Sequence, residues 1–280
     1  IGVRLVGSEM CIRDRYKDII DLSIGDTDFT TDESIINAAF RDAKAGHTHY
    51  GDPKGDPELI SAVCGAWQAD FAQELTPDHV LVTASSCLGM ALVMLAILDP
   101  GDEVIAFSPY FPMYREQIEL AGGVCVDVPT YASEDYAIDE ARLRAAITPR
   151  TKAIVICTPN NPTGVVYSAQ TLTRMADILT EKSKAFGHNI FLVSDEPYRD
   201  IAFDGKKVPY PAAFYPHTLT CFSYSKSLSL PGERLGYVAV RPGCEGEEVL
   251  VDMMAQISRF TGHNLSLIHI SEPTRRTPIS

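Results

Sequence analysis

Two short segments of this chain are apolar on both faces that a strand presents, and they restrict the possible fold more than any other feature. They read AIVIC at residues 153–157 and IFLVS at residues 190–194. A strand of this kind lies in a sheet that is covered on both sides, and such sheets are mostly parallel, with helices as crossovers. The sequence therefore predicts an α/β fold in which a mostly parallel seven-stranded sheet lies between helices.

Strand and helix patterns alternate along the chain. Strand patterns occur at residues 79–83, 103–107, 124–128, 153–157, 190–194, 218–223 and 236–240. Helical periodicity and capping residues predict helices at about 32–45, 57–74, 87–98, 113–121, 139–146, 169–186 and 245–260. Ligands of such sheets bind at the carboxyl ends of the strands, and the polar motifs described below follow strands.

Composition excludes several function classes. The chain has 280 residues and a net charge of −13, which argues against nucleic-acid or anionic-membrane partners because an acidic surface repels both. Its seven cysteines show no paired spacing and no metal-binding pattern, so we expect free thiols in a reducing compartment and no metal. No secretory leader and no apolar stretch long enough to cross a bilayer is visible, which makes the cytoplasm the expected location.

The two ends of the chain are related to each other at the level of DNA. Residues 6–15 read VGSEMCIRDR and residues 265–274 read LSLIHISEPT. Codons can be chosen for the first segment whose reverse complement, read in frame, encodes the second, a relation that resembles one sequencing adapter joined to both ends of a fragment. The alternative is coincidence. We therefore expect residues 1–15 and 265–280 to be artefactual and residues 16–264 to be the natural domain, cut at both ends, which resequencing across both junctions would test.

A lysine follows the strand pattern at 218–223, in the motif S-Y-S-K-S-L-S-L-P-G-E-R. Lys226 lies between small hydroxyl residues, and Arg234 follows eight residues later. Lysine becomes a nucleophile only where a dry pocket or nearby cations lower its pKa. Hydroxyls and a forked guanidinium suit a dianionic phosphate. The alternative is a solvated lysine in a polar loop.

A carboxylate follows the apolar strand at 190–194, in the motif V-S-D-E-P-Y. Asp195 at the end of a buried strand is costly unless it meets a cation or a donor. A protonated pyridine nitrogen would be such a partner, and Tyr198 can reach the same ligand. The alternative is a structural salt bridge.

Two further motifs lie at strand ends. C-T-P-N-N-P-T-G at 157–164 is rigid and directs the amides of Asn160 and Asn161, although an ordinary Asn-Pro turn is the alternative. V-T-A-S-S-C-L-G at 82–89 begins a helix at a turn of small residues, so its free backbone N–H groups form an anion site. A plain serine cap is the alternative there.

Together and in this order, these four motifs resemble those of fold-type I pyridoxal-5′-phosphate (PLP) enzymes, the class I and II aminotransferases. The resemblance runs through residues 20–264 and implies the PLP-binding large domain of an aspartate aminotransferase-like fold. It also implies transfer of an amino group between an amino acid and a 2-oxo acid. Some motifs resemble those of bacterial enzymes often grouped as aspartate or aromatic aminotransferases, but the substrate cannot be read from them.

The resemblance implies a role for each site residue. Lys226 would form the Schiff base with PLP and then move the proton, while Asp195 would keep the pyridine nitrogen protonated. Tyr198 and Asn161 would hydrogen-bond the phenolic oxygen, and Asn161 would also contact substrate. The phosphate would be bound by Ser223, Ser225, Arg234 and the amides of Ser86 and Cys87. Phe111 would stack on the ring, and a core phenylalanine is the alternative there.

Two matches imply a homodimer. Tyr50, in H-Y-G-D-P-K-G, resembles the tyrosine that reaches the partner subunit's phosphate site, with an exposed turn tyrosine as the alternative. Gly25 resembles the glycine whose backbone lies against the substrate carboxylate. Arg259 is a weaker candidate near the partner's site.

The chain also departs from the family pattern. The C-terminal domain that supplies the arginine for the substrate carboxylate would begin near residue 264, so no residue here has that role. Ser85, Ser86 and Cys87 stand where glycines are more usual. We therefore expect PLP binding with weak or no turnover from this chain.

Other functions share these motifs. A β-lyase, a decarboxylase or a synthase would differ only in the residues that face the substrate. Some transcription regulators use the same domain as a PLP-binding sensor, joined to a basic winged-helix domain. Conversion of PLP to its pyridoxamine form by an amino acid separates a transaminase from these alternatives.

Overall fold

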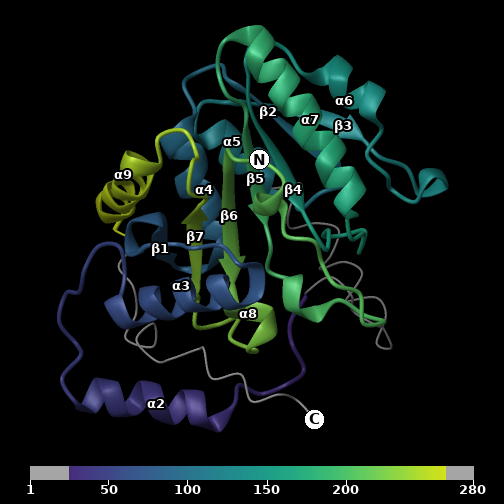
Figure 1. Ribbon diagram of the computed structural model, residues 1–280. Helices are drawn as coiled ribbons and strands as arrows, with labels where there is room; N and C mark the ends of the chain where they lie inside the picture. The colour runs from purple at the N-terminus through teal and green to yellow at the C-terminus, as the bar shows by residue number, and fades with distance from the viewer. Residues whose placement is uncertain (1–24, 263–280) are drawn as a thin grey trace, which may run out of the picture.

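The computed structural model describes residues 25–262 and contains one seven-stranded sheet with helices on both sides (Figure 1). The strand order is β1-β7-β6-β5-β4-β2-β3. The strands are β1 Val80–Thr83, β2 Glu103–Ser108, β3 Val124–Pro129, β4 Thr151–Cys157, β5 Phe191–Asp195, β6 Thr218–Ser223 and β7 Gly236–Val240. The expected adapter-like ends, and the ends of the proposed natural domain, lie outside the described residues.

The sheet is mostly parallel, as the apolar strands predicted. β3, β2, β4, β5 and β6 pair in parallel, whereas β7 runs antiparallel to both β6 and β1. Every residue of β5 and all but one residue of β4 are buried, because helices cover both faces of these strands. This confirms the predicted fold class.

The helices form two layers around the sheet. They are α2 Glu33–Lys44, α3 Pro57–Phe71, α4 Ser85–Ile97, α5 Met113–Leu120, α6 Glu140–Ala146, α7 Ala169–Phe186, α8 Tyr224–Ser227 and α9 Glu247–Phe260. One apolar cluster joins α4, α5 and α9 to one face of the sheet. On the other face, α6 and α7 cover the half that contains β2 and β4, while α3 covers β1 and β7.

Three helix boundaries differ from the predictions. α3 ends at Phe71, three residues early, because Ala72 adopts a left-handed conformation with φ 52°. α4 begins at Ser85, two residues before the predicted start, without a side-chain cap. The short α8 was not predicted; Ser223 caps it by accepting a hydrogen bond from the Ser225 amide.

Gly236, the first residue of β7, lies very close to the backbone of two neighbouring segments. Gly236 pairs with Ser223 at the end of β6 and with Thr83 at the end of β1. A Cβ atom on Gly236 would lie 2.3 Å from the Phe222 carbonyl oxygen and 2.8 Å from the Ser85 backbone carbon. Only glycine therefore allows the starts of α4 and α8 to meet at this edge of the sheet.

We predict that Gly236→Ala lowers the free energy of unfolding by about 1–3 kcal/mol, because the added methyl group overlaps backbone that cannot move independently. Gly65→Ala is the matched control, since Gly65 lies inside α3 and its added Cβ would meet no atom within 4 Å. That control should be neutral or stabilising by about 0.5–1 kcal/mol. Urea unfolding of the three proteins measures both effects, and equal stability of Gly236→Ala and the unsubstituted chain would refute the close approach.

Candidate functional site

The predicted site residues gather at one edge of the sheet, at the carboxyl ends of β1, β5 and β6. β1 runs parallel to β6 because both pair antiparallel with β7. The residues after β1 and β6 therefore begin α4 and α8 at the same edge, and Figure 1 shows α8 beyond the end of β6. Asp195 is the last residue of β5 and joins this edge from the neighbouring strand.

Lys226 lies on α8, half-buried, and connects distant parts of the chain. Its Nζ donates a hydrogen bond to the carbonyl oxygen of Gly25. A second contact ties the same two segments together, because the Thr31 hydroxyl donates to the Ser229 carbonyl oxygen at 2.6 Å. The structure therefore brings Gly25 next to Lys226, two residues that the sequence singled out separately.

Asp195 is buried and only partly satisfied. Its Oδ2 accepts a hydrogen bond from the Tyr114 hydroxyl at 2.7 Å. Its Oδ1 is the one buried side-chain oxygen or nitrogen without a hydrogen-bond partner among residues 25–262. Burial raises the pKa of Asp195 to about 6, although the hydroxyls of Tyr114 and Ser86 oppose this rise. A buried acceptor of this kind calls for a donor or a cation.

Tyr114 was missed by the sequence reasoning. It lies on α5, is 3% exposed, and its ring packs edge-on against Phe111 with centroids 5.7 Å apart. Phe111 is itself half-buried, so the predicted stacking residue and the partner of Asp195 support each other. The available signal was the spacing in F-P-M-Y, which brings both rings to the start of one helix.

Asn161 and Tyr198, which the resemblance assigns to the same cofactor oxygen, lie within hydrogen-bond distance of each other. The Asn161 side-chain amide donates to the Tyr198 hydroxyl at 3.2 Å. Burial raises the pKa of Tyr198 to about 12, so the phenol remains a hydrogen-bond donor. Asn160 has other partners, because its amide donates to the Thr163 hydroxyl at 2.8 Å and to the Pro109 carbonyl oxygen at 3.3 Å.

The start of α4 has the backbone geometry that an anion site needs. α4 begins at Ser85 with no side-chain cap, which leaves the first-turn N–H groups, including those of Ser86 and Cys87, free of a capping side chain. Arg234 Nη2 donates to the Ser85 hydroxyl at 2.5 Å. Ser85 and Arg234 both have positive φ, 83° and 60°, a strained conformation that tends to occur at functional sites.

Ser223 and Ser225 lie beside this helix start, and their hydroxyls are 2.6 Å apart. Both residues are buried. Tyr50 and Arg259 are both exposed, Tyr50 to 94%. Neither side chain makes a hydrogen bond or ion pair with the cluster within the part of the chain that the structure describes.

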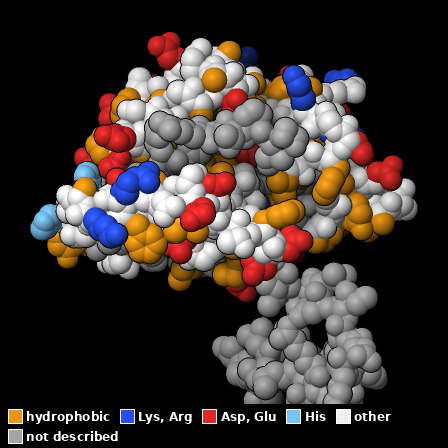
Figure 2. Space-filling view, turned by 90° about the horizontal axis from the view of Figure 1, so that it is seen from below, with side chains coloured by type: hydrophobic (Ala, Val, Ile, Leu, Met, Phe, Trp, Pro, Cys, Tyr) orange, Lys and Arg blue, Asp and Glu red, His pale blue; other side chains and the backbone are white. Residues whose placement is uncertain are grey.

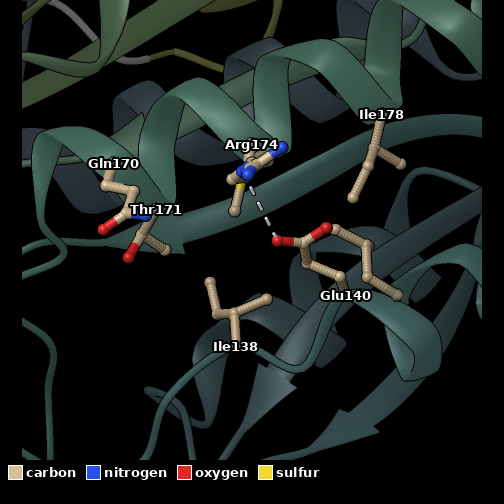
Figure 3. Close-up of a pocket in the computed structure, with 8 residues that line it drawn as sticks. Ile138, Glu140, Gln170, Thr171, Arg174 and Ile178 are labelled. Atoms are coloured by element: carbon tan, nitrogen blue, oxygen red, sulfur yellow. Dashed lines mark ion pairs between the residues drawn. The ribbon is translucent and has the colours of Figure 1, made fainter.

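A large cavity opens beside the cluster. It has a volume of about 880 Å³ and is lined by Asn161 and Tyr198 together with residues 159–169 and 201–209. A second cavity, of about 140 Å³, lies between α6 and α7, where Arg174 and Glu140 form a 3.9 Å ion pair (Figure 3). This smaller cavity shares no residue with the cluster.

Residues 25–262 contain no group of three or more His, Cys, Asp or Glu side chains that could hold a metal ion. No helix in the same range is long and apolar enough to cross a membrane.

The fold matches a known class of enzymes. The arrangement matches that of fold-type I enzymes, since the structure superposes on an aminotransferase from Eubacterium rectale with a TM-score of 0.85 and 32% identity. It also superposes on the aspartate aminotransferase of Thermus thermophilus, solved with maleate, with a TM-score of 0.83 and 35% identity.

The sequence comparison then identifies the family. The profile of the aminotransferase class I and II family matches residues 17–269, and the chain belongs to this family. It is 38% identical over 248 residues to a probable aspartate/prephenate aminotransferase of Thermus aquaticus. The family and its fold imply PLP as the cofactor.

The chain covers only part of these relatives. The match spans 88% of this chain and 61% of the Thermus aquaticus protein. The two structural matches cover 90% and 93% of this chain, but 66% and 65% of the solved chains.

The Asp195 carboxyl generates a prediction for the protein without cofactor. Its folded-state pKa of about 6 exceeds the ordinary 3.8, so the folded chain binds this proton more tightly than the unfolded chain. The resulting stability is complete below about pH 4 and is lost as the pH rises through about 6, by roughly 3 kcal/mol in total. Relative to Asp195→Asn, the free energy of unfolding should therefore fall across this pH range.

Asp177→Asn, at an exposed position on α7, serves as the control and should show no such difference. Chemical denaturation at pH 4, 5, 6 and 7 measures the effect. Parallel pH profiles for the unsubstituted chain and Asp195→Asn would contradict the unsatisfied burial of this carboxylate.

Proposed function

We propose that this chain is the cofactor-binding part of a PLP-dependent aminotransferase, which moves an amino group between an amino acid and a 2-oxo acid. The observation that carries the proposal is the buried Asp195 Oδ1, which has no hydrogen-bond partner in residues 25–262. A protonated ring nitrogen of PLP would supply the missing donor and a positive charge. The donor set at this edge of the sheet therefore fits the cofactor.

Each part of the cluster has a task in this proposal. Bound PLP would supply an electron sink next to the substrate Cα atom. The Lys226 amine would hold the cofactor through its aldehyde carbon, with loss of water, and, once the substrate's amino group had displaced it, would move the proton to and from Cα. Asp195 would keep the ring nitrogen protonated, and Phe111 would lie against the ring. Tyr198 and Asn161 donate hydrogen bonds to the ring's phenolic oxygen.

The phosphate would lie at the start of α4. Ser86 and Cys87 lie in the first turn of α4, where backbone N–H groups have no partner within the helix, and the helix dipole favours a negative charge there. Arg234 adds a guanidinium, which matches the geometry of a phosphate. Ser223 and Ser225 would complete the ligand set with their hydroxyls.

The substrate would bind between Gly25 and Asn161. The Gly25 carbonyl oxygen accepts a hydrogen bond from Lys226, so this backbone already lies at the reacting amine. The names of the related aminotransferases favour aspartate as the amino donor. A relative solved with maleate, a dicarboxylate, supports the same preference.

We further propose that the chain acts as a homodimer in the cytoplasm. Large hydrophobic side chains are exposed around α2, where Phe29 is 78%, Phe40 62% and Tyr50 94% exposed. Figure 2, which views the molecule from the side that carries α2, shows exposed hydrophobic side chains on this face. A second subunit would cover them and would receive Tyr50 in its phosphate site. The six free cysteines of the described residues fit a reducing compartment.

The proposal predicts a visible absorption band when PLP is added to the purified chain. Lys226→Ala should abolish the band, because the covalent bond needs this amine. Lys184→Ala, which removes an exposed lysine from the last turn of α7, should retain it. Borohydride reduction followed by peptide mapping should attach the cofactor to the peptide that contains Lys226.

An amino acid such as aspartate should bleach this band and produce the pyridoxamine form, slowly because weak turnover is expected of this chain. Bleaching without that product would favour a lyase, a decarboxylase or a synthase. A band of equal strength in Lys226→Ala would refute the role of the lysine.

The dimer generates a separate prediction. Tyr50→Ala and Lys226→Ala should each bind PLP poorly. A mixed dimer, with one subunit of each variant, should regain one normal site. One site then carries both substitutions, whereas the other carries neither. Titration with PLP after refolding an equimolar mixture measures the recovery. If Tyr50 served its own subunit, mixing would restore nothing.

A further inference from the structure

An ion pair is buried directly behind the cluster, on residues that the proposed chemistry does not use. Arg199 Nη1 lies 3.0 Å from Glu196 Oε2, and their side chains are only 9% and 0% exposed. Glu196 Oε1 also accepts hydrogen bonds from the Ser194 hydroxyl at 2.8 Å and the Thr220 hydroxyl at 3.4 Å. Both carboxylate oxygens are therefore occupied.

Aromatic side chains enclose the guanidinium. Arg199 Cζ lies 4.8 Å from the ring centroid of Phe71 and 4.4 Å from that of Phe222. Its Nη2 donates to the Tyr237 hydroxyl at 3.3 Å, and the same hydroxyl accepts from Trp67 Nε1 at 3.0 Å. Arg199 thus joins α3, β6 and β7 to the segment that follows β5.

Along the chain, each residue of the ion pair directly follows one residue of the cluster. Asp195 precedes Glu196, and Tyr198 precedes Arg199. Asp195 and Tyr198 contact the apolar cluster under α4 and α5, through Tyr114 and through packing. The aromatic partners of Arg199 belong to the cluster under α3, on the opposite face of the sheet. The segment therefore has one pair of side chains directed to each face.

Backbone hydrogen bonds hold this segment near its two ends, and the Ile201 amide also donates to the Tyr198 carbonyl oxygen at 3.1 Å. The Glu196 amide donates to the Cys221 carbonyl oxygen at 2.8 Å, which extends the pairing of β5 with β6 by one residue. The Arg199 amide donates weakly, at 3.4 Å, to the Glu196 carbonyl oxygen. Between these points the side-chain ion pair is the strong connection across the turn.

Stability alone does not account for the pair. Removing two charges from water is costly, and well-packed apolar residues in place of a buried ion pair are often as stabilising or more so. An ion pair also fixes the orientation of its side chains, because the planar guanidinium contacts Glu196 and Tyr237 together in only one orientation. A rotation that turned Asp195 or Tyr198 away from the cluster would break these contacts.

We propose that Glu196 and Arg199 are positioning residues, which hold Asp195 and Tyr198 in the orientation that the cofactor requires. This inference rests on the proposed function for its consequence, but the constraint itself belongs to the chain without cofactor. It assigns a function to the two charged residues of the segment that touch neither PLP nor substrate.

The test uses the double variant Glu196→Gln/Arg199→Met. The glutamine carbonyl can still accept from Ser194 and Thr220, and the methionine fills the space between Phe71 and Phe222. The urea midpoint should therefore stay close to that of the unsubstituted chain. Amide hydrogen exchange of residues 195–199, measured without cofactor, should accelerate about tenfold or more, and the Kd for PLP should rise by a similar factor.

The bound cofactor provides a second readout. The pH at which its absorption band changes depends on the hydrogen bonds from Tyr198 and Asn161, so this pH should shift in the double variant. Arg144→Met is the control, because Arg144 forms a 2.7 Å pair with Glu181 on the exposed surface of α6 and α7. It should change neither the exchange of residues 195–199 nor the affinity for PLP.

Normal exchange and normal PLP affinity in a stable double variant would overturn the proposal. If that variant does not fold, Arg199→Lys decides, since lysine keeps the charge but cannot contact Glu196 and Tyr237 together. Faster exchange of residues 195–199 in Arg199→Lys supports positioning, and unchanged exchange refutes it. If the unsubstituted chain bound no PLP, the proposed function would fail, while the exchange measurement would still decide whether the pair orders this segment.

Discussion

The unsatisfied carboxylate of Asp195 is the constraint on which the rest of this site depends. A buried acceptor without a partner is expensive, so its presence calls for an explanation such as a ligand that completes it. Here Tyr114 holds one oxygen and leaves the other without a partner among residues 25–262. The apolar β5 carries the carboxylate to this position, and helices on both faces keep water away from it.

The parallel sheet explains why the other groups converge on the same edge. β1 and β6 end at the same edge because both pair antiparallel with β7, which lies between them, and Gly236 lets the helices that follow them approach. The strained Ser85 then starts a helix without a capping side chain, and Lys226 lies on the neighbouring helix. An uncapped helix start, an amine and a buried carboxylate thus share one edge, and this is the set of groups that the proposed function assigns to PLP. The buried Glu196–Arg199 pair holds the carboxylate's segment from behind.

Much of this could be predicted from the sequence, because local patterns decide it. β6 and β7 have the predicted bounds, since turn residues surround both apolar strands. α8 and the early start of α4 were not predicted, because α8 is a single turn, too short for a helical period, and no capping side chain marks the start of α4. The Tyr114–Asp195 hydrogen bond joins residues 81 positions apart, and no local pattern announces it. Tyr50 is exposed within one chain, so only the family resemblance assigns it a task.

A crystal structure of the chain with bound PLP tests the central claim most directly. The account predicts that the ring nitrogen lies within hydrogen-bond distance of Asp195 Oδ1. Continuous electron density should join Lys226 Nζ to the cofactor, with the phosphate at the start of α4. A cofactor bound elsewhere, or a ring nitrogen that contacts another group while Asp195 Oδ1 stays without a partner, would contradict it.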